Sequence, residues 1–493
     1  MGRRDALLRL SIMAALLLGG AMAPVFAADV KNLSVTVSSG TQANAYGGYT
    51  IEEGASALQN ALTLSGPAKV LGASAGGWSR WGNAEWNTLT IRLDEDGLLG
   101  PSDIVGGGVA ESEGGGAAVH NTVYIESGTV EGTVEGGVAV GINGVGDGTG
   151  DVLSNQVTMS GGTVYSVFSG ETGEGNANDN VVTIKGSAAV TGKSNAVYGG
   201  YTIDGNASGN IVNIEDDADI HGEIMGGYTR AGSLISGNKV NVTGGNVNEN
   251  TVYGVYTAYG DVLDNQAVIK GTGQAGSSDT NSVYAGFTNI GAAAGNILYI
   301  QDSAEIAGSA FAGYQGGFIS SETVERNQVF MSGGSVGGDL TGGGSNNGGE
   351  TLNNYVEITG GTVSGNVYSG FTDSADALEN TLTVAGGRVE GSLFGGYSNT
   401  GTANENKLTF SAGTARSDAY GGYAQEGADG NEAVLSGTSV LEGNATGGSS
   451  ARGEASGNSL TIKENSEVKG DAAGGDVYMG TISKNIITIQ YNA

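Results

Sequence analysis

The sequence predicts an all-β protein, a right-handed parallel β-solenoid of about 16 to 17 coils with roughly 28 residues in each coil. Two repeated elements predict this fold: an Asn-x-φ-x-φ pattern, in which φ is an apolar residue, and an aromatic-Gly-Gly-aromatic element that follows it. No long helical periodicity is present after about the first thirty residues. Glycine supplies 93 of the 493 residues but shows no strict every-third-residue period, which excludes collagen.

The Asn pattern is the more regular of the two repeats. Side chains on a strand alternate between two faces, so the Asn and both φ residues share one face. A unit this short cannot bury that face alone, whereas stacked units bury it continuously. We therefore expect the Asn side chains to form an inward ladder at a corner, bonded to neighbouring amides and to the turn backbone. The copies lie 25 to 34 residues apart and begin at Asn60, Asn87, Asn121, Asn155, Asn180, Asn210, Asn238, Asn265, Asn296, Asn327, Asn354, Asn380, Asn406, Asn431, Asn458 and Asn485, with a degenerate copy at residues 31–37.

The aromatic-Gly-Gly-aromatic element is expected to stack in the same way. Its double glycine, as in Gly199-Gly200, is predicted to supply positive φ at a sharp turn. Residues three apart on a strand face opposite ways, so one of the two aromatic stacks would lie outside unless the glycines bend the chain. Structural ladders are the main interpretation, and a sugar-binding aromatic strip is the alternative. One stack would hold Tyr198, Tyr253, Tyr284, Phe311, Tyr368, Phe394 and Tyr420, and the other Tyr201, Tyr228, Tyr256, Phe287, Tyr314, Phe371, Tyr397 and Tyr423.

The N-terminus predicts export. Three arginines stand within the first nine residues, an apolar run extends to about Met22, and Val25-Phe26-Ala27 offers a small-residue cleavage site. A transmembrane anchor is the alternative, but the apolar run is short for a bilayer. We therefore divide the chain into a signal peptide, residues 1–27, and a repetitive β-solenoid domain, residues 28–493.

Charge and cysteine content restrict the partners. The chain contains no Cys, so its stability is expected to come from backbone ladders and packing. The formal charge is −31 and would become −33 after loss of the three arginines and one Asp of the leader. A chain this acidic should repel nucleic acid and anionic membranes.

No catalytic set is visible in the sequence, so we expect no enzyme. The only histidines, His120 and His221, fall at different points of the repeat about three coils apart. A polysaccharide lyase or hydrolase, which would need carboxylates assembled across coils, is the alternative. No cofactor is expected. Calcium is the one ion that the acidic segments Asp94–Gly97, Asp147–Asp151 and Glu215–Asp219 would suit, but none completes an EF-hand loop or a calcium β-roll repeat.

One segment outside the repeats is a candidate ligand-binding site. It contains all three tryptophans, Trp78, Trp81 and Trp86, together with Arg80. Exposed tryptophans are good platforms for sugars and cations. A hydrophobic cap over the N-terminal coils is the alternative interpretation. Several loops near these residues are long, including residues 106–120 and 137–154, which predicts a decorated side suited to recognition.

The leader, the Cys-free acidic chain rich in Gly and Asn, and the two repeats resemble the passenger of a bacterial autotransporter adhesin over about residues 30–493. The resemblance implies a β-helix displayed at the cell surface, or released, that mediates adhesion or aggregation. Its partner would be a glycan or protein of a host or bacterial surface, or a second copy. A secreted structural or matrix protein is the alternative. The sequence ends inside a repeat at Asn485, so a translocator barrel would be a separate or missing part, and the open last coil is expected to aggregate.

Overall fold

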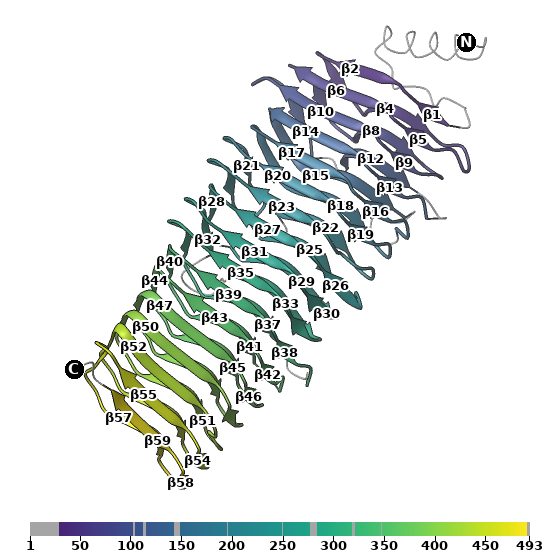
Figure 1. Ribbon diagram of the computed structural model, residues 1–493. Helices are drawn as coiled ribbons and strands as arrows, with labels where there is room; N and C mark the ends of the chain where they lie inside the picture. The colour runs from purple at the N-terminus through teal and green to yellow at the C-terminus, as the bar shows by residue number, and fades with distance from the viewer. Residues whose placement is uncertain are drawn as a thin grey trace. The chain divides into compact units, whose positions relative to one another are not determined.

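The computed structural model describes residues 29–101, 104–111, 115–141, 148–194, 196–248, 250–276, 283–317, 321–346 and 348–490. The signal peptide expected at residues 1–27 lies outside these ranges. The chain divides into two compact units, Met1–Gly232 and Ser233–Ala493. Within the described residues every regular element is a β-strand, and strands pair in parallel with their equivalents one coil away (Figure 1). The chain holds about 16 coils of about 27 residues, so the predicted parallel β-solenoid is confirmed.

Four kinds of strand recur along the coils, although not every coil has all four: the Asn strand, a short middle strand, the aromatic strand that carries the Gly-Gly element, and a corner strand just before the next Asn. In the first unit the Asn strands are β2 (Ser34–Val37), β6 (Ala61–Gly66), β10 (Thr88–Leu93), β14 (Thr122–Ser127), β17 (Gln156–Met159), β20 (Val181–Ile184) and β23 (Ile211–Ile214). The aromatic strands are β4 (Ala45–Thr50), β8 (Ser74–Ser79), β12 (Val105–Glu111), β15 (Thr129–Val140), β18 (Thr163–Thr172), β22 (Val197–Thr202) and β25 (Ile224–Thr229), of which β15 and β18 also include the middle strand. The other middle strands are β3 (Thr41–Gln42), β7 (Lys69–Val70), β11 (Leu98–Leu99), β21 (Ala189–Val190) and β24 (Asp219–Ile220), and the corner strands are β1 (Val30–Lys31), β5 (Ala57–Leu58), β9 (Ala84–Glu85), β13 (Ala118–Val119), β16 (Val152–Leu153) and β19 (Ala177–Asn178).

The second unit repeats this order. Its Asn strands are β27 (Lys239–Val242), β31 (Gln266–Ile269), β35 (Ile297–Ile300), β39 (Gln328–Met331), β43 (Tyr355–Ile358), β47 (Thr381–Val389), β50 (Lys407–Ala415), β52 (Glu432–Leu441), β55 (Ser459–Lys463) and β59 (Ile486–Gln490). The aromatic strands are β29 (Val252–Tyr259), β33 (Val283–Ile290), β37 (Ala310–Gln315), β41 (Leu340–Ser345), β45 (Val367–Thr372), β48 (Leu393–Ser398), β51 (Ala419–Ala424), β53 (Ala445–Ser450) and β57 (Ala472–Val477). The middle strands are β28 (Asn246–Asn248), β32 (Gln274–Gly276), β36 (Glu305–Ile306), β40 (Ser335–Val336), β44 (Thr362–Val363) and β56 (Glu467–Val468), and the corner strands are β26 (Leu234–Ser236), β30 (Asp261–Leu263), β34 (Ala293–Ala294), β38 (Val324–Glu325), β42 (Thr351–Leu352), β46 (Ala377–Leu378), β49 (Ala403–Asn404), β54 (Glu454–Ser456) and β58 (Thr481–Ser483).

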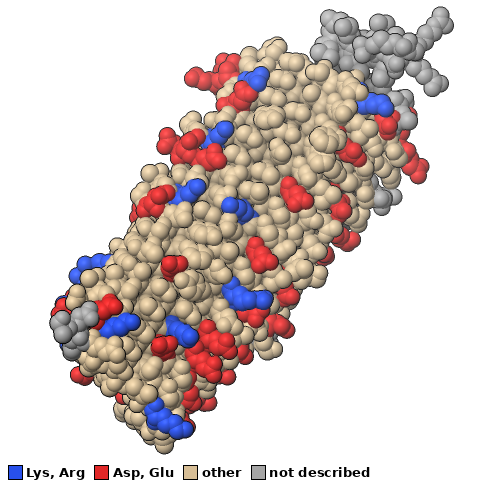
Figure 2. Space-filling view, in the orientation of Figure 1, with Lys and Arg blue, Asp and Glu red and all other residues tan. Residues whose placement is uncertain are grey.

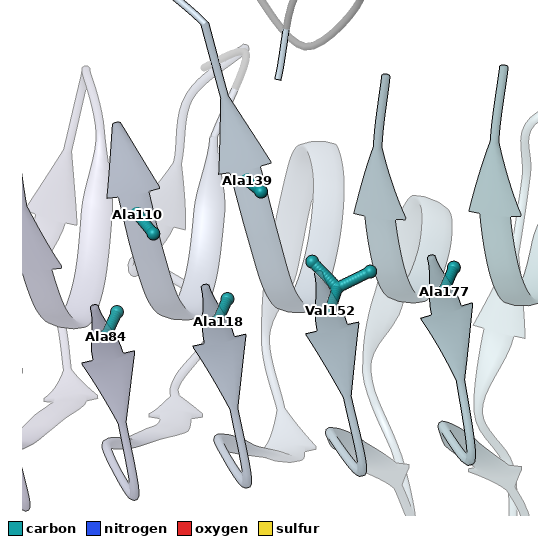
Figure 3. Close-up of a cluster of buried hydrophobic side chains, with 6 residues drawn as sticks. All are labelled: Ala84, Ala110, Ala118, Ala139, Val152 and Ala177. Carbon is teal, nitrogen blue, oxygen red and sulfur yellow. The ribbon is translucent and has the colours of Figure 1, made fainter. Parts of the chain in front are cut away.

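The core follows the two-residue period of the strands. In β20, Val182 and Ile184 point inward and are fully buried, while the residues between them are half-buried. Where the corner strands approach the ends of the aromatic strands the core residues are small. Figure 3 shows one such layer, made of Ala84, Ala110, Ala118, Ala139, Val152 and Ala177. In the last described coil the inward residues Ile487 and Ile489 of β59 are 45% and 51% exposed, and the aggregation expected of this coil stays a prediction.

The Asn ladder is confirmed within each unit. Asn180 donates its backbone N–H and its Nδ2 to the Oδ1 of Asn210, at 3.0 Å each, and Nδ2 also donates to the carbonyl of Val152. Asn238 bonds Asn265 in the same way, and Asn265 bonds Asn296. Since these amides are buried, each of these hydrogen bonds replaces a hydrogen bond to water that burial would otherwise forfeit.

The role predicted for the double glycine is wrong. Gly199 and Gly200 lie inside β22, and neither has positive φ. They are glycines because space is lacking: a Cβ on Gly200 would lie 2.6 Å from Nδ2 of Asn210, and one on Gly199 would lie 2.9 Å from Cβ of Asn210. Positive φ is instead found at a glycine shortly after the end of several Asn strands, such as Gly162 after β17 and Gly361 after β43.

Positive φ also recurs immediately before each ladder Asn, where the chain turns its corner. This position has φ between 54° and 69° in every copy. Glycine occupies it in Gly209, Gly237, Gly295, Gly430 and Gly457, while residues as different as Gln59, Trp86, His120, Arg326 and Lys484 occupy it elsewhere. The corner is therefore imposed by the ladder that follows, since most of these residue types do not favour this conformation.

Both aromatic columns lie on the same side of the strand. Tyr198 and Tyr201 of one coil touch edge to face at 5.5 Å, and Tyr201 stacks on Tyr228 of the next coil at 4.9 Å. The strand pairing skips the first glycine, which reverses the alternation and brings residues three apart to one face. In the second unit the stacks run in register but are interrupted in β41, where Thr341 and Gly344 replace the aromatics.

Candidate functional site

The structure separates the three tryptophans. Trp78 lies in β8, in the aromatic column, where its ring contacts Tyr46 at 5.4 Å and Tyr49 at 6.4 Å. Its Nε1 donates to Oε2 of Glu111 at 3.1 Å, and its other neighbours are the buried residues Ala75, Val109, Val138 and Val140. Burial raises the pKa of Tyr46 to about 12, as expected for a phenol within this packing. Trp78 therefore has the packing of a structural residue.

Trp86 lies elsewhere, at the corner before Asn87. It is 56% exposed, holds φ of 58°, and stacks on His120, the corresponding corner residue one coil on, with ring centroids 4.1 Å apart. A bulky residue in the left-handed region costs roughly 1–2 kcal/mol. More than half of the Trp86 side chain nevertheless stays in solvent, so part of the ring is open to a partner.

Trp81 and Arg80 lie between the other two. The guanidinium of Arg80, which is exposed, lies 6.0 Å from the centroid of the Trp81 ring, at the limit of a cation–π contact. Among the described residues no two of the three tryptophan rings stack on each other. The segment thus offers one exposed aromatic pair, Trp86 with His120, rather than the single platform that the sequence suggested.

A carboxyl pair lies in the aromatic columns of the first unit. Glu135 of β15 occupies the column position before Phe168, and Glu171 of β18 the position before Tyr201. Glu135 is 1% exposed and hydrogen-bonds Glu171, so the pair must share a proton. Desolvation raises the pKa of Glu171 to about 7, and its bond with Glu135 opposes that rise. The sequence did not single out these residues, because they belong to different coils and different columns.

A groove on the outer face of the second unit was also missed. Its lining includes Tyr299, Phe330 and Glu357 in one column and Gln301, Ser332 and Thr359 in the next, around a volume of about 240 Å³. The aromatic residues interrupt a column of small polar residues three positions after each ladder Asn, such as Thr383, Thr409, Thr461 and Thr488. An aromatic residue at a position usually held by Thr is the signal that would have revealed the groove.

The histidines and acidic segments do not converge in the described residues. His120 stacks on Trp86, whereas His221 pairs with Asp219 at 2.9 Å. Asp94 caps its own turn by accepting from the N–H of Asp96, and Asp147 lies outside the described residues. Across the part of the chain that is described, no group of three or more His, Cys, Asp or Glu side chains is arranged to hold a metal ion.

Acidic side chains outnumber basic ones on the face drawn in Figure 2, in keeping with the formal charge of −31. In the described ranges no helix has the length and apolarity needed to cross a membrane. Comparisons with protein-family models, with curated proteins and with solved structures find no match.

Proposed function

We propose that this chain is an exported β-solenoid, displayed at a cell surface or secreted, that mediates adhesion or aggregation by binding a glycan, a protein or another copy of itself. The stacked-coil fold supports this role because outward side chains vary without disturbing the inward ladders. The leader-like N-terminus and the resemblance to autotransporter passengers support export and display. On this proposal the chain acts by binding and not by catalysis.

The observation that carries the proposal is the exposed pair formed by Trp86 and His120. Five other corners in the chain use glycine, which adopts the left-handed conformation without cost. A tryptophan that holds a left-handed backbone conformation, is more than half exposed and stacks on a second ring suits an interface whose energy comes from a few aromatic contacts. Display of many copies would strengthen weak single contacts.

Because glycine occupies the corner position in five other copies, substitution by glycine at this position tests the proposal. Trp86→Gly removes the ring and relieves the backbone, so the variant should keep or slightly raise the melting temperature. Beads coated with this variant should bind host cells, bacterial cells or immobilised glycans at least tenfold less than beads coated with the unaltered chain. Gln59→Gly, the same change at the preceding corner, is the matched control and should leave binding unchanged.

Other outcomes would point to the alternatives. If binding survives both Trp86→Gly and His120→Gly, the aromatic pair is not the contact. If the chain binds nothing but assembles into a matrix, the secreted structural protein replaces the adhesin. Release of products from an acidic polysaccharide by the purified chain would replace both with a lyase or hydrolase.

A further inference from the structure

The groove on the Asn-strand face of the second unit crosses three coils. Tyr299 of β35, Phe330 of β39 and Glu357 of β43 are paired in register and point outward, since the residues on either side of each are buried. Parallel strands lie about 4.8 Å apart, so three coils give a floor of about 10 Å. That length accommodates two linked sugar rings. It therefore suits a short segment of an oligosaccharide better than a single small molecule.

Two of the three residues on this floor are aromatic. The rings of Tyr299 and Phe330 are nearly parallel, at 18°, with centroids 5.4 Å apart. Carbon atoms in contact lie about 3.5–4.0 Å apart, so rings at this separation are offset and part of each face stays uncovered. Tyr355 lies beside Phe330, with the two ring centroids 5.9 Å apart and the rings tilted by 53°.

The other parts of the groove are polar. Gln301, Ser332 and Thr359 follow the aromatic column at the ends of the same strands. Glu357 brings a carboxylate beside Phe330, and the hydroxyl of Tyr355 donates to it while burial raises the pKa of Tyr355. A carboxylate accepts hydrogen bonds only, as hydroxyl groups of a ligand can supply, and it repels an anion.

We infer that this groove binds a neutral oligosaccharide of at least two pyranose units. The C–H faces of the sugar would lie against the rings of Tyr299 and Phe330, and its hydroxyls would bond Glu357 and Gln301. The column does not need aromatic residues for folding, because Thr383, Thr409 and Thr461 occupy it in later coils. This inference rests on the proposed function only in assuming that the chain is exported. It does not require binding through Trp86.

The experiment is calorimetric titration of the full chain with neutral oligosaccharides of two to six units, differing in sugar and linkage, and with acidic oligosaccharides of the same length. We expect binding of at least one neutral series. Tyr299→Thr and Phe330→Thr, which restore the residue common in this column, should each weaken it at least tenfold while leaving the melting temperature almost unchanged. Glu357→Gln should weaken it several-fold.

Tyr124→Thr is the matched control, because Tyr124 is an exposed aromatic residue at the same column position in the first unit, with Thr90 and Thr158 as its neighbours. It should leave the titration unchanged, as should Trp86→Gly. The inference is overturned if no neutral oligosaccharide binds at millimolar concentration, if only acidic ones bind, or if the groove variants bind as tightly as the unaltered chain. If one of these results is found and beads coated with the chain still bind cells, the groove proposal fails. The proposed attachment function is then retained, because it does not require the groove.

Discussion

Gly108 lies against the side-chain amide of Asn121 so closely that a Cβ on Gly108 would overlap the amide group. The same relationship joins Gly77 to Asn87 and Gly396 to Asn406. The two sequence repeats therefore pack against each other. The Asn side chains fill the corner, and the second glycine of each pair leaves room for them. Val255 stands at this glycine position in one coil, and there the bond from Asn265 Nδ2 to the carbonyl of Ile235 lengthens to 3.3 Å.

The first prediction compares two glycines of the same strand. Gly108→Ala should lower the melting temperature of the chain, with a cost on the order of 3 kcal/mol, because the added methyl group must displace a buried amide. Gly106→Ala is the control: its Cβ would meet a side-chain methyl of Val109 at 3.1 Å and two backbone carbonyls at 3.7 and 3.9 Å. Equal melting temperatures for the two variants would show that the corner is not tightly filled.

The second prediction concerns the ladder. Asn406 accepts from both nitrogens of Asn380, and its Nδ2 donates to the carbonyl of Ala377 at 2.8 Å. Asn406→Ala leaves these buried groups without partners, so we expect a loss on the order of 3–5 kcal/mol in chemical unfolding. Asn406→Asp should be as harmful at neutral pH, because the carboxylate cannot donate. Thr409→Ala, on the outward face of β50, the strand that begins directly after Asn406, should cost less than about 1 kcal/mol.

The sequence was sufficient for the fold because the Asn pattern carries both the repeat length and the strand period. Asn180, Asn210 and the residues that follow them could be placed inward from alternation alone. The corner conformation before each Asn could not be predicted, because Gln59, Trp86 and Lys484 share no local preference for positive φ.

The sites were harder to predict than the fold. The sequence predicted a site at Trp78, Trp81 and Trp86 because they are close along the chain. Residues that are close in sequence can nevertheless lie on different faces of a coil, and the three side chains do not come together. Residues such as Phe330 and Glu357 come together only across coils, and they become recognisable once the equivalent positions of all copies are compared.

The third prediction separates structural aromatic residues from binding ones. Tyr397 stacks between Phe371 at 5.5 Å and Tyr423 at 5.3 Å, each within 9° of parallel. Tyr397→Ala should lower stability by about 3 kcal/mol, since it removes both stacks and leaves a gap beside Phe394. Oligosaccharide titration and bead binding should be unchanged where the variant is folded. A loss of binding without a loss of stability would instead favour the sugar-binding strip for these columns.

The last prediction is a pH dependence carried by Glu171. Its pKa is raised to about 7 in the folded chain, chiefly by desolvation, and the groups that face it are Glu135, Tyr198 and Tyr201. A raised carboxyl pKa means that the folded chain keeps a proton that the unfolded chain releases near its ordinary value of 4.5. The contribution of Glu171 should therefore lower stability as the pH rises from about 4.5 to about 7, by at most about 1.4 kcal/mol per pH unit, and this contribution should stay constant above that range.

Glu171→Gln tests this directly, because the amide keeps the shape and cannot ionise. The variant should be more stable than the unaltered chain at pH 8 and should lose most of the difference in melting temperature between pH 5 and pH 8. Glu174→Gln, which changes an exposed carboxylate on the same segment, is the control and should keep the original slope. Any pH slope that remains in Glu171→Gln is assigned to Glu135, and Glu135→Gln combined with it should remove that remainder. If the single and double variants both retain the full slope, the pH dependence originates elsewhere and the shared proton between Glu135 and Glu171 is refuted.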